Sequence, residues 1–150
     1  MWNTKSLIFY FSLAILCTVI FALLEIQIEG KDGWAKKLPT WKKYIGNFNP
    51  NTPLTGYHMY IWLLLLLIPH VAFLFTPWSM GKHLIIISFY IFILLFEDFL
   101  WFAFNPNYGI TKFRKEYIKW HPLWIGPLPI QYYFGFALWS AVFYLTFIIE

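Results

Sequence analysis

The sequence predicts an all-α integral membrane protein with four transmembrane helices. Hydrophobic residues make up 60% of the 150 residues and charged residues only 12%, whereas soluble domains contain about 45–50% and about 25%. One soluble core of this size could not bury so much apolar surface. We therefore exclude a water-soluble enzyme and a nucleic-acid-binding domain. The single cysteine, Cys17, excludes an internal disulfide and a cysteine-based zinc site.

Four apolar stretches are long enough to cross a bilayer, which takes about 20 residues per helix. They cover about residues 6–28, 54–77, 83–104 and 130–149. Each run is continuous rather than alternating, which favours helices over the strands of a membrane barrel. Pro69 lies inside the second stretch and is expected to kink that helix. No small-residue cleavage site follows the first stretch, so we expect it to be retained rather than removed as a signal peptide.

The basic residues predict the orientation of the chain. Nine of the 11 Lys and Arg residues lie in the loop after the first span or in the loop after the third span. The other two, Lys5 and Lys82, lie on the opposite side. Because cytoplasmic loops of membrane proteins are rich in Lys and Arg, we expect both loops in the cytoplasm and both termini outside.

Both basic loops carry apolar residues at helical spacing. Over residues 34–45 these residues are Trp34, Leu38, Trp41 and Ile45, and over residues 110–120 they are Ile110, Phe113, Tyr117 and Trp120. Lysines and an arginine fill the positions between them. The pattern predicts two amphipathic helices on the cytoplasmic membrane surface. Such helices act as anchors and orientation signals, or alternatively cover a site.

The two halves of this single transmembrane domain, about residues 1–77 and 78–150, share a layout. Each consists of a span, an acidic residue, a basic amphipathic segment, a turn with proline and a second span. Residues 21–25 also resemble residues 93–97. One interpretation is a parallel repeat about an axis along the membrane normal. The alternative is that any two helical hairpins in one membrane look alike.

Acidic residues within the apolar stretches are the strongest indication of function. A carboxylate at the bilayer centre costs about 2.5–3.5 kcal/mol, so Glu97 is expected to face the bundle interior. The predicted topology places a set of acidic residues and histidines in one cytoplasmic-facing layer. This set consists of Glu25, Glu29, His58, Glu97, Asp98 and His121. Glu25, His58, Glu97 and Asp98 are the catalytic candidates; Tyr57, Trp101, His121, Trp124 and Tyr132 are the candidates for substrate binding.

Four uses of this cluster compete. In the first, Glu97 serves as an acid under aromatic side chains that stabilise positive charge on an isoprenoid or sterol-like substrate. In the second, the acids form a proton or cation pathway of an oligomeric transporter or channel subunit. In the third, the acids pair with loop lysines or with one another and only fix helix packing. A fourth use is a Zn, Mn or Fe ion held by glutamate and histidine, since carboxylate and imidazole suit these metals. Because the sequence has neither an HExxH motif nor histidines three or four residues apart, no metal ligands are assigned, and no cofactor is identified.

The segment Phe96-Glu97-Asp98-Phe99-Leu100-Trp101-Phe102 resembles the acidic and aromatic segment of membrane-bound lycopene cyclases. The resemblance covers these seven residues and lacks the proline that precedes the acidic pair in that family. Because those proteins protonate a carotenoid end group, the resemblance implies an isoprenoid substrate.

The expected function is therefore a lipid- or isoprenoid-handling enzyme or binding protein that uses Glu97 as an acid. A transporter or channel subunit and a structural subunit without catalysis remain the alternatives. The expected partners are membrane lipids and an apolar small molecule, without nucleic acid. Four helices form only a small bundle, so a homo-oligomer is also considered.

Overall fold

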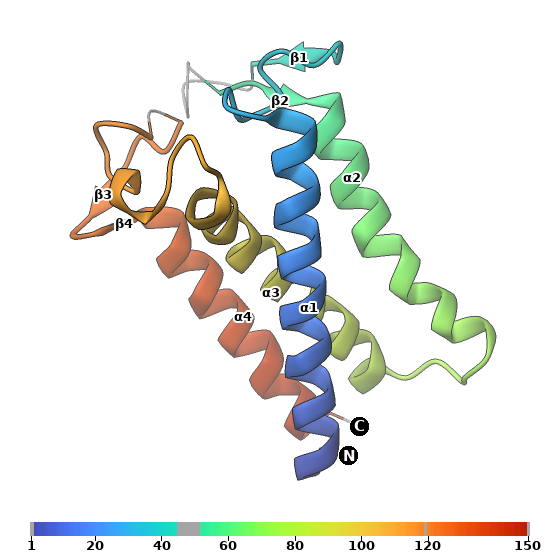
Figure 1. The fold of residues 1–150 in the computed structure, drawn as a ribbon. Coiled ribbons are helices and arrows are strands. Elements are labelled where there is room, and N and C mark those ends of the chain that lie inside the picture. The colour runs from blue at the N-terminus through green and yellow to red at the C-terminus, as the bar shows by residue number, and fades with distance from the viewer. Residues whose placement is uncertain (1, 45–51, 119, 150) are drawn as a thin grey trace.

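The computed structural model describes residues 2–44, 52–118 and 120–149 and is mostly helical. Its long helices are α1 (Thr4–Glu29), α2 (Gly56–Leu67), α3 (Met80–Phe104) and α4 (Ile130–Ile148), and its 3-10 helices are η1 (Ile68–Leu74) and η2 (Ile110–Lys112). Strands β1 (Lys42–Lys43) and β2 (Leu54–Thr55) pair antiparallel, as do β3 (Trp124–Ile125) and β4 (Leu128–Pro129). The helices run side by side, with both ribbons at one end of the bundle (Figure 1).

Three helical segments of the described chain are long and apolar enough to cross a membrane: Thr4–Glu29, Gly56–Leu74 and Met80–Phe104. They match the first three predicted spans. The fourth predicted span matches α4, which carries no Asp, Glu, Lys or Arg but does carry Gln131 and several tyrosines. Helix α4 is not among the three segments above, so the fourth span stays a prediction.

Close packing of α1 on α3 forms the centre of the bundle. Ala14, Thr18 and Ala22 follow one another at intervals of four residues on α1, and each is at most 1% exposed. Small residues at this spacing let two helix backbones approach closely. A hydrogen bond of 3.0 Å between the hydroxyl groups of Tyr10 and Ser88 joins the same two helices.

Pro69 changes the type of helix rather than kinking one. Helix α2 ends at Leu67, and the chain continues as the 3-10 helix η1 with Pro69 in its first turn. Proline has no N–H and is therefore best accommodated where a new helix begins. The expected kink within a single span is replaced by this junction.

The amphipathic helices expected over residues 34–45 and 110–120 are not α-helical in the described residues; Ile45 and Lys119 lie outside them. The first loop folds into turns followed by β1, and the second contains only the short helix η2. Gly33 has a φ of +60°, and a Cβ there would lie 3.1 Å from the Trp101 ring. Because the loops turn inward onto the helix ends, Trp34, Phe113 and Trp120 pack against residues of the bundle, whereas Tyr117 is exposed.

The ends of α1 and α3 that carry these loops are joined. The side-chain amide of Asn105, directly after α3, donates a 2.9 Å hydrogen bond to the carbonyl of Gly30, directly after α1. Each half of the chain then has the same order of elements: a long helix, a loop, a two-stranded ribbon and a second helix. The internal repeat stays a prediction.

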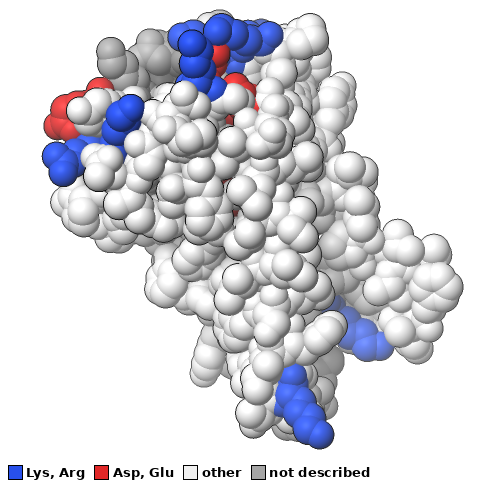
Figure 2. Space-filling view, viewed as in Figure 1, with Lys and Arg blue, Asp and Glu red and all other residues white. Residues whose placement is uncertain are grey.

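The charges are segregated along the bundle axis. Figure 2 shows Lys and Arg gathered at the end with the loops, while uncharged surface covers most of the helices. Lys5 and Lys82 are exposed in the first turns of α1 and α3, at the opposite end from the ribbons. Both loops therefore lie at one end, and both termini lie at the other (Figure 1).

Candidate functional site

A cavity of about 140 Å³ lies at the loop end of the bundle, where α1, α2 and α3 meet. Its ionisable lining residues are Glu25, Glu29, His58, Glu97 and Asp98, and its other lining residues are Trp34, Trp62, Leu94, Trp101, Phe102 and Trp120. Glu97 is only 6% exposed and lines this cavity. The acidic side chain deepest in the predicted spans thus faces the protein interior and not lipid.

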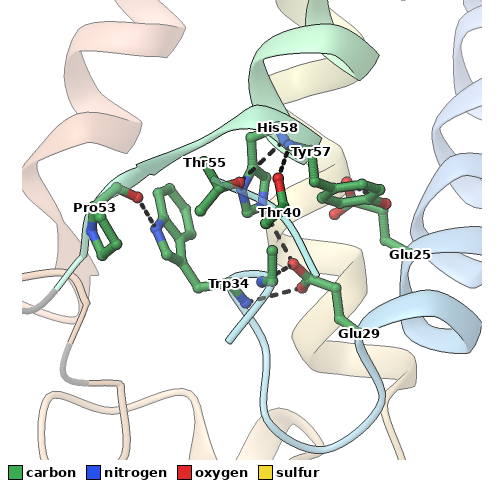
Figure 3. Close-up of polar contacts among 9 residues, drawn as sticks. Glu25, Glu29, Trp34, Thr40, Pro53, Thr55, Tyr57 and His58 are labelled. Atoms are coloured by element: carbon green, nitrogen blue, oxygen red, sulfur yellow. Dashed lines mark hydrogen bonds and ion pairs between the residues drawn. The ribbon is translucent and has the colours of Figure 1, made fainter. Parts of the chain in front are cut away.

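Glu29, the last residue of α1, fixes the first loop against the cavity. Its carboxylate accepts a 3.0 Å hydrogen bond from the backbone N–H of Trp34 and a further one from the N–H of Ala35 (Figure 3). Trp34 and Ala35 have φ angles of 50° and 48°, which cost about 1–2 kcal/mol each for residues with a Cβ. Successive residues in this conformation point their N–H groups at one anion, so the carboxylate offsets the backbone strain.

His58 enters the cavity from the first turn of α2. Thr55 caps this helix by accepting a 3.2 Å hydrogen bond from the His58 backbone N–H, and its hydroxyl also lies 2.7 Å from His58 Nδ1. The other ring nitrogen, Nε2, lies 3.3 Å from Glu29 Oε1. The Trp34 ring stacks on the imidazole at a centroid distance of 4.6 Å. The imidazole is therefore held from three sides.

Glu25 and Glu97 face each other across the α1–α3 contact. The Tyr57 hydroxyl donates a 3.3 Å hydrogen bond to Glu25 Oε1, and the Glu25 and Glu97 carboxyl groups interact with each other. Within the described part of the chain, Glu97 Oε1 and the indole nitrogen of Trp101 are buried without a hydrogen-bond partner. Such orphaned polar atoms are rare in folded proteins and indicate a role, a solvent molecule or an ion.

Asp98 belongs to a second polar group on the other side of α3. Its carboxylate lies 3.2 Å from His121 Nε2 and accepts a hydrogen bond from the Tyr132 hydroxyl. His121 Nδ1 in turn contacts the Gln131 amide, and the Trp124 indole donates to the His121 carbonyl at 2.8 Å. Asp98 also borders the cavity, whereas the other residues of this second group do not.

The structure brings Glu25, His58, Glu97, Asp98 and Trp101 to one cavity, while their catalytic and substrate-binding roles stay predictions. Tyr57 lies behind Glu25 rather than in the lining. His121, Trp124 and Tyr132 surround Asp98 instead of lining the cavity.

Several lining residues do not follow from the sequence pattern. The spacing predicts Trp34 and Trp120 on a membrane-facing surface, and nothing in the pattern distinguishes Trp62. Glu29 belongs to the predicted polar layer but not to the predicted catalytic residues. Its four-residue spacing from Glu25 is the signal that identifies it, because residues four apart share a helix face.

The ion pair of the first loop does not involve the cavity. Lys37 Nζ lies 2.8 Å from the carboxylate of Asp32 at the loop surface, and the hydrogen bond from Lys37 lowers the pKa of Asp32. No lysine or arginine is among the lining residues that the structure describes. The described contacts therefore do not show loop lysines paired with the acidic residues of the cavity.

Comparison of this chain with protein-family models, curated proteins and solved structures found no significant match.

Proposed function

We propose that this chain is a four-span membrane protein whose cavity is an acid–base site for the end group of a lipid- or isoprenoid-class substrate. The observation that carries the proposal is that two residues lining one cavity, Glu97 and Trp101, each have a buried polar atom without a hydrogen-bond partner, Oε1 and the indole N–H. A substrate double bond beside Glu97 would give this carboxyl group an acceptor for its proton.

The cavity size limits what enters it. A volume of about 140 Å³ is below the roughly 300–1,000 Å³ of pockets that enclose drug-sized ligands. An end group of a long apolar molecule fits, while the remainder of the molecule stays in the lipid. The lining aromatic residues Trp34, Trp62, Trp101 and Trp120 supply ring faces that stabilise a positive charge near them.

The reaction class is a proton-neutral rearrangement. Glu97 donates its proton to a carbon–carbon double bond, which forms a C–H bond and leaves a carbocation on the neighbouring carbon. Asp98, which accepts a hydrogen bond from Tyr132, takes a proton from an adjacent carbon, so that a double bond forms again. The proton then returns to Glu97, and no oxidant or reductant is needed. Glu25, whose carboxyl group interacts with that of Glu97, holds Glu97 in place from α1.

Ligand retention tests this proposal. The full chain is purified in detergent and its bound lipids are extracted and identified by mass spectrometry. Replacing Leu94, which lines the cavity, with tryptophan should fill the space and deplete one species by about tenfold or more, because an overfilled site cannot accept an end group. Leu64→Trp on the exposed surface of α2 is the matched control. Identical lipid profiles in all three proteins would contradict the proposal and favour a structural subunit.

The proposed topology has α4 as the fourth span, both basic loops in the cytoplasm and both termini outside. It is supported by the concentration of Lys and Arg at the loop end and by the apolar length of α4, about 28 Å at 1.5 Å per residue. In a Cys17→Ser background, cysteines introduced at Lys37 and Lys115 should react with a membrane-impermeant maleimide only after the cells are opened. Labelling of both in intact cells would reverse the orientation.

A further inference from the structure

We infer that Glu25, Glu29 and His58 bind one divalent transition-metal ion of the Zn²⁺ or Mn²⁺ class. One ligand atom from each of the three side chains lies within 4.8 Å of the others. Around an ion with bonds of about 2.0–2.2 Å, ligand atoms lie roughly 3–4.3 Å apart. Small side-chain rotations therefore suffice to close the three groups on an ion.

A fourth polar atom points to the same place independently of these three. Glu97 is 6% exposed, and its Oε1 is buried without a hydrogen-bond partner in the described residues. It lines the same cavity as Glu25, Glu29 and His58. Glu97 also interacts with Glu25, one of the three ligands, so an ion bound by the triad would lie close to the carboxyl group that carries this unpaired oxygen.

The two acidic ligands, Glu25 and Glu29, also favour a cation between them. Four carboxyl groups border the cavity, and within the described lining no Lys or Arg is present. Burying several carboxylates together without a cation is costly. A divalent ion balances two of these charges at the point where Glu25 and Glu29 converge.

Each proposed ligand is oriented by a partner outside the triad. The Thr55 hydroxyl lies 2.7 Å from His58 Nδ1, which leaves Nε2 facing the cavity. The backbone N–H groups of Trp34 and Ala35 orient Glu29, and the Tyr57 hydroxyl orients Glu25. Outer contacts of this kind fix the ligands of protein metal sites and set which histidine nitrogen is available.

The chemistry of the ligand set selects the class of ion. Two carboxylates and one imidazole suit Zn²⁺, Mn²⁺ or Fe²⁺, whereas Ca²⁺ and Mg²⁺ prefer oxygen ligands alone. The inference goes beyond the proposed function and does not rest on it, because an ion can be measured without any substrate.

The second polar group supplies a matched control. His121 also lies beside a carboxylate, and its ring nitrogens contact Asp98 and Gln131, as those of His58 contact Glu29 and Thr55. His58 and His121 are similarly buried, at 4% and 6% exposure. Of these two histidines, only His58 has a ring nitrogen within 4.8 Å of carboxylate oxygens from two acidic residues, Glu25 and Glu29, among the described residues.

Metal content of the full chain in detergent tests the inference. The protein is stripped with a chelator, equilibrated with Zn²⁺ or Mn²⁺, and analysed by elemental mass spectrometry. We expect one ion per chain in the wild type and in His121→Asn, and at least about tenfold less in His58→Asn and Glu29→Gln, because losing a ligand costs at least as much affinity as losing its outer partner. Equal metal content in all four proteins, or no retention by the wild type, would overturn the inference.

X-ray absorption at the zinc edge of the wild type keeps the test decisive if a variant fails to fold. One imidazole among oxygen ligands is expected, and a spectrum with oxygen ligands alone contradicts the site. Glu97→Gln should retain the ion, because Glu97 is not one of the three ligands. A wild-type protein that binds one ion but has the same lipid profile as Leu94→Trp would count against the proposed function alone.

Discussion

Glu29→Ala is expected to lower the free energy of unfolding by about 3–5 kcal/mol, the cost of removing one partner from a buried charged network. The Glu29 side chain is 4% exposed, so solvent does not screen its contacts. Its removal would leave the N–H groups of Trp34 and Ala35 unpaired while both residues keep their left-handed conformation. It would also take away the carboxylate that contacts His58. No other single side chain joins α1, the first loop and α2 in this way among the contacts described here.

Thermal unfolding in detergent measures this effect. A loss of this size corresponds to a fall of roughly 6–20 °C in melting temperature for a chain of this length. Glu116→Ala, which removes an exposed acid of the second loop, should change the free energy of unfolding by less than about 0.5 kcal/mol. Equal melting temperatures for the two variants would show that Glu29 does not hold the loop.

The positions of the membrane-spanning helices followed from composition because a continuous apolar run has few other structures available in lipid. Polarity and length alone therefore predicted α1, the α2–η1 segment and α3. The conformation of the loops did not follow, because helical spacing of aromatic residues is also produced by a loop folded onto helix ends. Trp34 hydrogen-bonds through its indole to the Pro53 carbonyl at 2.8 Å, and Trp120 stacks on Phe102. Such tertiary contacts leave no periodic signal of their own.

The depth of a side chain could be predicted, but its direction could not. Glu25, His58 and Glu97 lie near the same ends of their helices, so the predicted topology brought them to one level. Rotation about each helix axis decides which of them meet. Glu97 and Asp98 are adjacent and therefore about 100° apart around α3. The structure accordingly places one against α1 and the other against the second loop and α4.

The two polar groups differ in how completely they are paired. In the Asp98 group, His121, Tyr132 and Gln131 form a closed chain of contacts. In the Glu97 group, one carboxyl oxygen and the Trp101 indole remain without partners among the described residues. Tertiary pairing explains the contacts of His121, Tyr132 and Gln131 in the Asp98 group well, because these contacts fix the second loop against α3 and α4. Such pairing does not explain the unpaired atoms of the Glu97 group. For this reason Glu97 is assigned as the acid of the proposed reaction.

Glu97→Gln is expected to reduce proton transfer to the substrate by about 10²–10⁴-fold, the usual contribution of a positioned acid. The amide keeps the shape of the side chain and its contact with Glu25 but has no acidic proton to donate. Because Oε1 has no partner to lose, the melting temperature and lipid retention should stay close to those of the wild type. Incubation in heavy water provides a readout that works with whichever lipid the protein retains. The wild type should introduce deuterium at carbon into that lipid, and Glu97→Gln should not.

Glu97→Asp separates the acid from its position. It restores an acidic group but withdraws it by one methylene from the cavity, so we expect deuterium incorporation between the wild-type and Glu97→Gln levels. A structural role for Glu97 predicts the reverse pattern, in which Glu97→Gln lowers the melting temperature and leaves deuterium incorporation unchanged. Wild-type incorporation in Glu97→Gln at normal stability would remove Glu97 from the reaction. Asp98 would then become the acid to test, since it is the other carboxyl group on α3 that borders the cavity.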